Sequence, residues 1–360
     1  MPFHVSVEKP IIERVLAIET SCDDTSVAVV ARDGMVRVLV SRDQDLAHVP
    51  FGGIVPEIAG RKHVEVLLPL VDVAVSKMPG GWGDIDGIVV TNRPGLLGSL
   101  LVGVVTAKTL ALAKKKPFLG VNHLEGHIFA PFLRDGEYLP SPTFQAPFIS
   151  LAVSGGHTSL YEIKAFGDYE LLGATRDDAA GEAFDKFAKL IGLGFPGGAA
   201  VDRNARTGDP SRYSFPRGLR GDGNLGFSFS GLKSAAQRLV QTMSKDQLAL
   251  ELPHLCASFQ EAVVDSLVEK LALAARTRNV KRVSVTGGVS ANSRLREKVS
   301  DWAKSMDIEL AIPPLRFCTD NAAMIGWVGI QRLNLGERDD QSLAPSPKPD
   351  ALFAGRKGPQ

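Results

Sequence analysis

Two segments of the chain share one pattern, an apolar strand, a small polar turn and a second apolar strand. The first is VLAIETSCDDTSVAVV at residues 15–30, and the second is FISLAVSGGHTSLYEI at residues 148–163. β-Branched residues on both sides of a turn of Gly, Ser, Asp or Thr predict a β-hairpin whose turn amides are free to face an anion. Two similar hairpins far apart in the sequence therefore predict a duplicated fold.

Each predicted hairpin is followed by a strand that runs into a glycine-rich turn and a helix. The sequence GIVVTNRPGLLGSLLVGVVTAKTLALA has this pattern at residues 87–113, and VSVTGGVSANSRLREKV has it at residues 283–299. Further helical stretches occur at residues 55–78, 179–193 and 255–276. Strands that alternate with helices are typical of an α/β protein whose helices cover its sheets.

The 360 residues are enough for two domains or for two lobes of one fold. Three prolines between the first half and the second hairpin mark the predicted boundary, namely Pro140, Pro142 and Pro147. We expect an N-terminal lobe at residues 1–145, a C-terminal lobe at residues 146–340, and a ligand between them. Residues 341–360 are rich in Pro, Gly and charge, which predicts a tail without chemistry.

Charge and cysteine content limit the class of protein. Lys and Arg number 41 and Asp and Glu number 40, so any contact with nucleic acid must come from a local basic patch. Cys22, Cys256 and Cys318 are far apart and form no C-x-x-C pair, which argues against a disulfide framework and a structural zinc site. This composition is typical of a globular protein in a reducing compartment.

The sequence has no pattern that predicts secretion or a membrane span. Residues 1–14 carry charged side chains without the apolar core of a signal peptide, and they lack the composition of a transit peptide. The longest apolar stretch, residues 96–113, contains Lys108 and follows Pro94 and Gly95, which favours a buried helix. We expect a soluble, cytoplasmic protein.

His123 and His127 lie four residues apart in the sequence NHLEGHIF. On a helix this spacing places both imidazole rings on one face, where they can chelate one metal ion. Two surface or capping histidines are the alternative. Asp320 precedes an apolar stretch in RFCTDNAAMIG, so it is either the N-cap of a helix or a third ligand from the second half.

A zinc peptidase of the H-E-x-x-H type requires a glutamate directly after its first histidine. Here Glu125 is two residues after His123, about 200° around a helix, so its carboxylate would face away from the metal. This position disfavours that class of peptidase. Metallopeptidases with other ligand patterns stay open.

Two glycine-rich turns are candidates for nucleotide binding. Residues 154–158 form SGGHT after a predicted strand, and residues 286–288 form TGG before Asn292 and Arg294. Glycine lets backbone amides approach a phosphate or carboxylate closely. Each turn alone is also compatible with an ordinary tight turn, but together they predict a nucleotide held from opposite sides.

The sequence DDAAGEAFDKFAKLIGLGFPGG at residues 177–198 predicts a helix with an apolar face. Asp185 lies away from the centre of that face, so it is either a solvated surface residue or a ligand for substrate hydroxyl groups. Gly197 and Gly198 either end the helical region or leave room for a ligand.

A basic loop is the candidate contact with a phosphate backbone. Its acidic residues are Asp202 and Asp209, and its basic residues are Arg203, Arg206, Arg212, Arg217 and Arg220. A solvated surface loop is the alternative.

A series of motifs between residues 15 and 327 closely resembles the tRNA adenosine threonylcarbamoyltransferase family. In chain order they are IETSCDDT, FGGIVPEIAGRKH, NRPGLLGSLLVG, NHLEGH, SGGHT, DDAAGEAFDK, PGG, FSFSGLK, GGVSAN and CTDNAAMIG. The resemblance implies the actin-like, sugar-kinase-like ATPase fold of two ribonuclease-H-like lobes, an α/β fold that agrees with the duplicated hairpins.

The resemblance also assigns the site. It implies that His123, His127 and Asp320 bind one divalent metal ion, with Fe²⁺ favoured and Zn²⁺ as the alternative. The matching substrate-binding positions are Ala152, Val153, Ser154, Gly155, Gly156, Asp185, Gly198 and Asn292, with Asp202 as a further position. Archaeal and eukaryotic relatives carry a tyrosine ligand where this chain has Ala152, so water or substrate is expected there, as in bacterial relatives.

The implied reaction moves threonylcarbamoyl from threonylcarbamoyl-AMP to the exocyclic amine of the adenosine 3′ of the anticodon, in tRNAs that read codons starting with A. We assign no side chain as a covalent nucleophile. A metal-dependent (glyco)peptidase and a non-catalytic nucleotide-binding partner are the alternatives.

Bacterial members of this family act with a shorter paralogous subunit and a small P-loop ATPase. The present chain has no G-x-x-x-x-G-K-[ST] motif of its own. The apolar helix expected at residues 55–78, with Val66, Leu67, Leu70 and Val71, is either a contact for the paralogue or part of the core.

Overall fold

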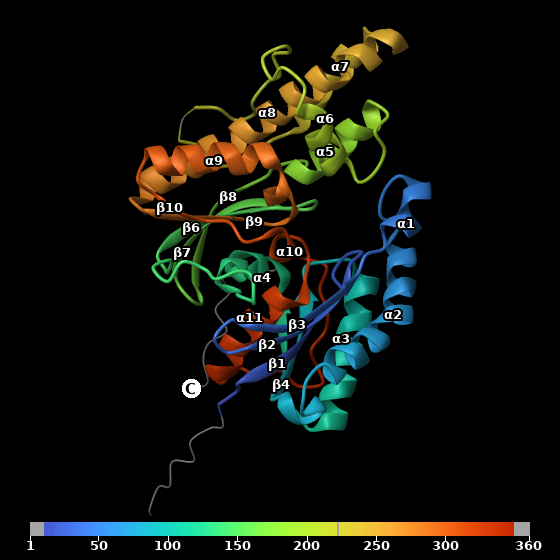
Figure 1. Cartoon of the computed structure of the whole chain (residues 1–360), viewed down its shortest axis with the longest axis vertical. Helices are drawn as coiled ribbons and strands as arrows, with labels where there is room; N and C mark the ends of the chain where they lie inside the picture. The colour runs from blue at the N-terminus through green and yellow to red at the C-terminus, as the bar shows by residue number, and fades with distance from the viewer. Residues whose placement is uncertain (1–10, 222, 349–360) are drawn as a thin grey trace, which may run out of the picture.

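The computed structural model describes residues 11–221 and 223–348. Two five-stranded sheets lie one above the other, and helices cover the outer face of each sheet and fill the space between them (Figure 1). This arrangement is the mixed α/β fold that the alternation of strands and helices predicts.

The first sheet has the strand order β3-β2-β1-β4-β5. β1 pairs antiparallel with β2 and parallel with β4, and β2 pairs antiparallel with β3. The predicted first hairpin is therefore the centre of this sheet. The strands are β1 (Arg14–Glu19), β2 (Thr25–Ala31), β3 (Val36–Arg42), β4 (Gly87–Arg93) and β5 (Phe118–Asn122).

The second sheet has the order β10-β9-β6-β7-β8, in which β6 pairs antiparallel with β7 and parallel with β9. Read from the other edge, the second sheet has the order β8-β7-β6-β9-β10. When the five strands of each half are numbered along the chain, both sheets therefore have the same order, 3-2-1-4-5. The structure confirms the predicted duplication. The strands are β6 (Phe148–Val153), β7 (Thr158–Ala165), β8 (Asp168–Ala174), β9 (Arg282–Thr286) and β10 (Glu309–Ala311).

Both faces of the first sheet are buried, as the apolar run of β1 requires. Leu16 and Ile18 pack in one core with α2 and α3, whereas Val15 and Ala17 pack in another core with α11. Successive side chains of a strand point to opposite faces, which explains the alternation. The covering helices are α2 (Pro56–Ser76), α3 (Leu97–Lys114) and α11 (Ala322–Asn334).

The outer face of the second sheet supports the largest core, in which Leu151 of β6 packs with Phe187 and Phe259 of two covering helices. The rings of Phe187 and Phe259 stack with centroids 3.9 Å apart. The helices on this side are α5 (Ala180–Leu190), α6 (Gly197–Ala205), α7 (Ser230–Gln241), α8 (Lys245–Arg278) and α9 (Ser293–Ser305). Between the sheets lie α4 (His123–Phe129), α10 (Leu315–Cys318) and α11 (Figure 1).

The end of the chain packs differently from the expected boundaries. α11 falls within the predicted C-terminal lobe at residues 146–340, but it covers the first sheet, where Gly329 lies directly against Val89. The chain then continues along β5 and β4, because Asp339 N donates to Phe118 O and Ser346 N donates to Asn92 O. The first sheet needs an apolar cover on its second face, and α11 provides it. Of the predicted tail, residues 341–348 lie in this stretch, and residues 349–360 lie outside the described residues.

One helix among the described residues, α3, is long and apolar enough to cross a membrane by length and composition alone. It packs against α2 and against β4 of the first sheet. α3 therefore covers a face of the first sheet, in agreement with the prediction of a packed helix in preference to a membrane span.

Candidate active site

The two histidines of the HLEGH motif begin and end the first helical turn of α4. β5 ends at Asn122, whose side chain caps α4 by accepting a hydrogen bond from Leu124 N at 2.9 Å. The rings of His123 and His127 are both buried, with centroids 4.6 Å apart and planes at 87°. The helical spacing therefore places both rings on one face, as predicted.

Asp320 approaches both histidines from a distant part of the sequence. Its Oδ1 lies 3.1 Å from His127 Nε2 and 3.4 Å from His123 Nε2. One ligand atom from each of the three residues lies within 4.8 Å of the others, so together they could hold one metal ion. Asp320 is not the N-cap of α11, because Asn321 fills that position and accepts from Met324 N.

Glu19, which was not predicted as a site residue, bonds to the ring nitrogen of His123 that faces away from Asp320. Its Oε2 lies 3.0 Å from His123 Nδ1 and accepts a hydrogen bond from Thr91 Oγ1 at 2.5 Å, while its Oε1 accepts from Ser21 N at 2.6 Å. A carboxylate behind a metal-bound histidine fixes the orientation of the ring. The signal was present in IETSCDDT, where a glutamate ends an otherwise apolar strand.

The electrostatics of the buried cluster follow from these contacts. Burial lowers the pKa of His123, but Asp320 and Glu19 outweigh it and hold that pKa well above its usual value. Burial raises the pKa of Asp320, yet the two histidines hold it well below its usual value. For His127, burial prevails and lowers the pKa. The cluster thus combines buried anionic and imidazole groups, the donor set that suits a divalent cation.

We predict that Glu19→Gln weakens metal binding without abolishing it. Glutamine keeps the size of the side chain but removes the negative charge behind His123, and loss of such an outer partner costs about 10–100-fold in metal affinity. Zn²⁺ affinity measured by calorimetry on the purified chain would show this. An unchanged affinity would mean that the Glu19 charge does not act on the ligand set.

Glu125 lies between the two histidines in sequence but faces away from them. Its carboxylate accepts hydrogen bonds from Arg332 Nη2 at 2.7 Å and from Tyr169 Oη at 2.8 Å. It is therefore not placed as a general base beside a metal ion held by His123 and His127. The prediction from helix geometry agrees with the structure.

The first predicted glycine turn lies directly after β6. Ser154 N donates to His157 O at 2.8 Å and so closes the turn, while a side chain added at Gly155 or Gly156 would meet open space. Both glycines are exposed, so a ligand can approach this turn. His157 also lies near the two histidines of α4, and its pKa is lowered to about 4 by burial and by their charge. Ala152 and Val153 are buried in β6, where both pair with β7 and Ala152 also pairs with β9.

The second glycine turn lies beside the first. Gly287 has φ +87°, and a Cβ there would lie 2.4 Å from Val153 O, so only glycine allows this approach. Asn292 caps α9 by accepting from Leu295 N at 3.0 Å, and its Nδ2 donates to Gln260 Oε1 at 2.7 Å. The Asn292 side chain therefore already bonds within the protein.

Two further predicted residues also hold helix beginnings. Asp185 accepts from Gly197 N at 2.7 Å at the start of α6, and burial raises the pKa of its carboxyl group. Asp202 accepts from Ser293 Oγ at 2.7 Å at the start of α9. Gly198 has open space at its Cβ position. Asp185 is thus neither solvated nor free, and it aligns the amides of the PGG motif.

The arginine-rich loop is largely neutralised. Arg212, Arg217 and Arg220 pair with Glu251, Asp265 and Glu269 of α8. These acidic partners lie 39–49 positions later in the sequence, so the local excess of positive charge in the loop is offset in the folded chain. The phosphate-binding interpretation stays a prediction. Arg206 lines a cavity of about 350 Å³ with Gln260, Ser293 and Arg294.

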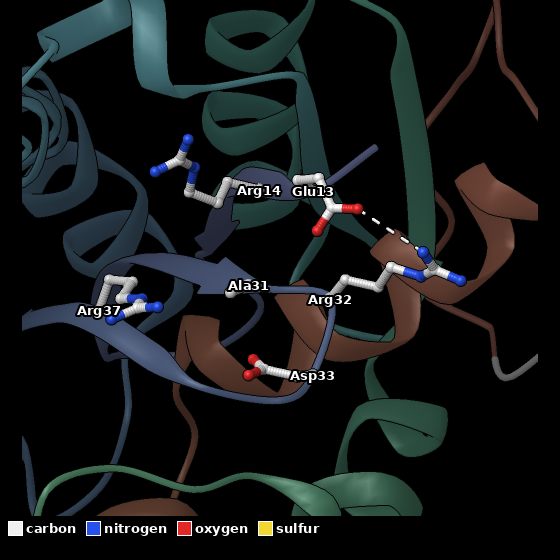
Figure 2. Close-up of a pocket in the computed structure, with 6 residues that line it drawn as sticks. All are labelled: Glu13, Arg14, Ala31, Arg32, Asp33 and Arg37. Carbon is white, nitrogen blue, oxygen red and sulfur yellow. Dashed lines mark ion pairs between the residues drawn. The ribbon is translucent and has the colours of Figure 1, made fainter. Parts of the chain in front are cut away.

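A larger cavity of about 560 Å³ lies at the other end of the first sheet. Figure 2 shows its lining of Glu13, Arg14, Ala31, Arg32, Asp33 and Arg37, with an ion pair between Glu13 and Arg32. β1 begins at Arg14 and ends at Glu19, so the length of the strand separates this cavity from the histidine cluster. Its size does not make it the reaction site.

Comparison with known proteins agrees with this geometry. The sequence profile described as tRNA N6-adenosine threonylcarbamoyltransferase matches residues 37–327. The enzyme of that name from Bdellovibrio bacteriovorus is 58% identical over 337 residues, which are 94% of this chain and 98% of the relative. The one from Anaeromyxobacter dehalogenans is 51% identical, over 93% of this chain and 98% of the relative.

Among solved structures, full-length HypF in a phosphate- and nucleotide-bound form superposes with a TM-score of 0.57 at 11% identity, covering 91% of this chain and 57% of HypF. At that identity the likeness shows the fold alone, and it is consistent with the expected actin-like, sugar-kinase-like architecture. The extent and identity of the sequence matches show more. The chain belongs to the tRNA N6-adenosine threonylcarbamoyltransferase family and is a transferase that modifies tRNA.

Proposed function

We propose that the chain transfers threonylcarbamoyl from threonylcarbamoyl-AMP to the exocyclic amine of the adenosine 3′ of the anticodon. The observation that carries the proposal is the triad of two buried histidines, His123 and His127, and the partly buried Asp320, near a turn with exposed glycines. The family assignment supports the acceptor, and the resemblance of the motifs supports the donor.

One group of residues would bind the phosphate of the donor, and a second group would hold the metal ion. The amides of Gly155 and Gly156 donate hydrogen bonds to the phosphate of threonylcarbamoyl-AMP, and Asp185 accepts from Gly197 N and so fixes the amides at the start of α6. His123, His127 and Asp320 would hold a divalent metal ion, which would supply Lewis-acid polarisation of the carbonyl group. The adenosine nitrogen then forms a bond to the carbamoyl carbon, the bond from that carbon to the phosphate oxygen breaks, and AMP leaves as the nitrogen loses a proton.

The metal is proposed to be Fe²⁺. Two histidines and one carboxylate leave open coordination positions, and this ligand set is common for non-haem iron as well as for zinc. Ala152 offers only a buried methyl group, so water or donor oxygens complete the coordination.

The alternatives fit less well. A peptidase would need a base beside the metal, and Glu125 is held away from it by Arg332 and Tyr169. A non-catalytic nucleotide-binding partner has no use for a triad of metal ligands. The relatives that share half or more of the sequence are named as transferases.

The shorter paralogue is proposed to dock on the outer face of α2 and α3. Among the residues named from the sequence, Leu67 and Val71 are buried in the core and do not serve. The exposed apolar residues of the two helices are instead Val64, Leu68, Leu97, Leu101, Val105 and Leu112, each at least half exposed. Exposed apolar side chains on two packed helices support a protein interface there. A small P-loop ATPase would complete the complex, in the cytoplasm.

The function is tested in a strain depleted of this protein. We expect mass spectrometry of its tRNA nucleosides to show loss of threonylcarbamoyladenosine, and restoration by the intact gene but not by His127→Ala. A full amount of the modified nucleoside after depletion would contradict the proposal.

A further inference from the structure

Glu125 makes the densest set of polar contacts in the buried part of α4, yet it touches no metal ligand. The side chain is buried, and its two carboxylate oxygens accept four hydrogen bonds. Three come from the Arg332 guanidinium at 2.7–3.1 Å, and one comes from Tyr169 Oη at 2.8 Å. A buried carboxylate needs such partners, but nothing in the core requires a carboxylate here.

The partners of Glu125 come from two other parts of the fold. Arg332 lies near the end of α11, the helix that begins directly after Asp320 and Asn321. Tyr169 lies on β8 of the second sheet. Glu125 therefore connects α4, which carries the two histidines, to the helix that follows the third ligand and to the opposite lobe.

A second contact fixes the same pair of helices close to Asp320. A Cβ added at Gly126 would lie 2.8 Å from Ile325 Cδ1 and 2.9 Å from Met324 Cγ, so α4 touches the first turn of α11 at this glycine. Arg332 is located seven or more residues further along α11, roughly 10 Å away at 1.5 Å per residue. Contacts at both ends of α11 fix its angle to α4. Because Asp320 directly precedes α11, that angle also fixes the position of Asp320 relative to the two histidines.

We propose that Glu125 is a positioning residue for the metal site, which it serves through its contacts with Arg332 and Tyr169. The inference rests on the proposed function, because it requires that His123, His127 and Asp320 bind a metal ion. Charge supports the geometry. Burial lowers the pKa of Arg332, but Glu125 and Glu337 outweigh it and keep the guanidinium charged. Glu337 pairs with Arg332 Nη1 at 2.8 Å, so removal of the Glu125 charge leaves Arg332 with a partner.

The test measures metal affinity directly. Full-length wild type, Glu125→Gln and Tyr169→Phe are titrated with Zn²⁺ by calorimetry and with Co²⁺ by visible absorption, which reports coordination geometry. We expect Glu125→Gln to lower Zn²⁺ affinity about 10–100-fold, the usual effect of an outer partner, and to change the Co²⁺ spectrum. Tyr169→Phe should change both in the same direction by less.

Asp265→Asn is the matched control, because Asp265 lies on α8, away from α4, and the change weakens its part-buried ion pairs with Arg217 and Lys298. It should lower the melting temperature and leave Zn²⁺ affinity unchanged. Wild-type affinity in Glu125→Gln, or an equal loss in Asp265→Asn, would overturn the proposal. If Glu125→Gln does not fold, unchanged affinity in Tyr169→Phe would overturn it. Failure of the wild type to bind either metal would instead overturn the metal site of the proposed function.

Discussion

Replacing His127 by alanine should remove both the metal ion and the transfer activity while the fold stays nearly intact. His127 Nε2 lies 3.1 Å from Asp320 Oδ1, so the imidazole is one of the three groups that surround the proposed metal position. Loss of a direct ligand should lower affinity by more than the ~10–100-fold typical of an outer partner. Its Nδ1 has no hydrogen-bond partner among the described residues, so the truncation breaks no internal hydrogen bond there.

Metal content by elemental analysis, transfer to tRNA and melting temperature should be measured on the same preparations. We expect metal and activity to fall together in His123→Ala and His127→Ala, with a free energy of unfolding within about 1–2 kcal/mol of the wild type. His254→Ala is the control, because that histidine lies on α8 and accepts a hydrogen bond from Asp209 N. Full metal content and normal turnover in either ligand variant would rule out this site.

The sequence predicted the parts of the site that depend on local periodicity. The spacing of His123 and His127 needs only a helix to bring the rings together, and the two hairpins need only the alternation of a strand. The same helical geometry placed Glu125 away from the metal, as its bond to Tyr169 shows. Three- and four-residue periods are properties of the backbone, and a single sequence displays them directly.

Local periodicity does not predict contacts between segments that are far apart in the sequence. No local pattern brings Asp320 to the histidines, and only the resemblance to a family placed it there. Glu19 ends an otherwise apolar strand, which makes it unusual, but no local pattern shows that His123 is its partner. Arg217 seemed free to bind phosphate because Asp265, its partner, lies 48 positions further on. The predicted lobe boundaries, which stay a prediction, follow chain order alone, whereas α11 returns to cover the first sheet.

Capping roles were difficult to distinguish from substrate binding. Asp185 and Asn292 resemble substrate-binding positions of the family. In the structure the Asp185 side chain, from α5, accepts a hydrogen bond from the first residue of α6, and Asn292 is the N-cap of α9. A carboxylate or amide at a helix start orients backbone amides, and those amides are themselves the groups that bind an anion. An aspartate or asparagine at such a position is compatible with a capping role and with substrate binding, so the sequence alone does not distinguish the two roles.

Aspartate in place of both Leu68 and Leu101 should abolish activity that depends on the paralogue while leaving the metal site unchanged. The two side chains are 54% and 50% exposed on adjacent helices, where Gly60 of α2 packs against Gly98 of α3. A leucine that becomes fully buried contributes about 1.5–3 kcal/mol, and an aspartate at the same position adds the cost of burying a charge. Loss of two such contacts should weaken the complex at least ~100-fold, since about 1.4 kcal/mol corresponds to tenfold.

The assay contains tRNA, threonine, bicarbonate, ATP, the donor-forming synthase, the paralogue and the small ATPase, and it is followed over many turnovers. Wild type should sustain modification only with both partners present, because its charges nearly balance and tRNA binding by one subunit requires positioned cations. Leu68→Asp/Leu101→Asp should keep its Zn²⁺ affinity but lose sustained turnover and binding to the paralogue. Leu250→Asp, at an exposed leucine of α8, should behave as wild type. Sustained turnover by wild type with the synthase alone would contradict the multi-protein proposal, and undiminished paralogue binding by the double variant would place the interface elsewhere.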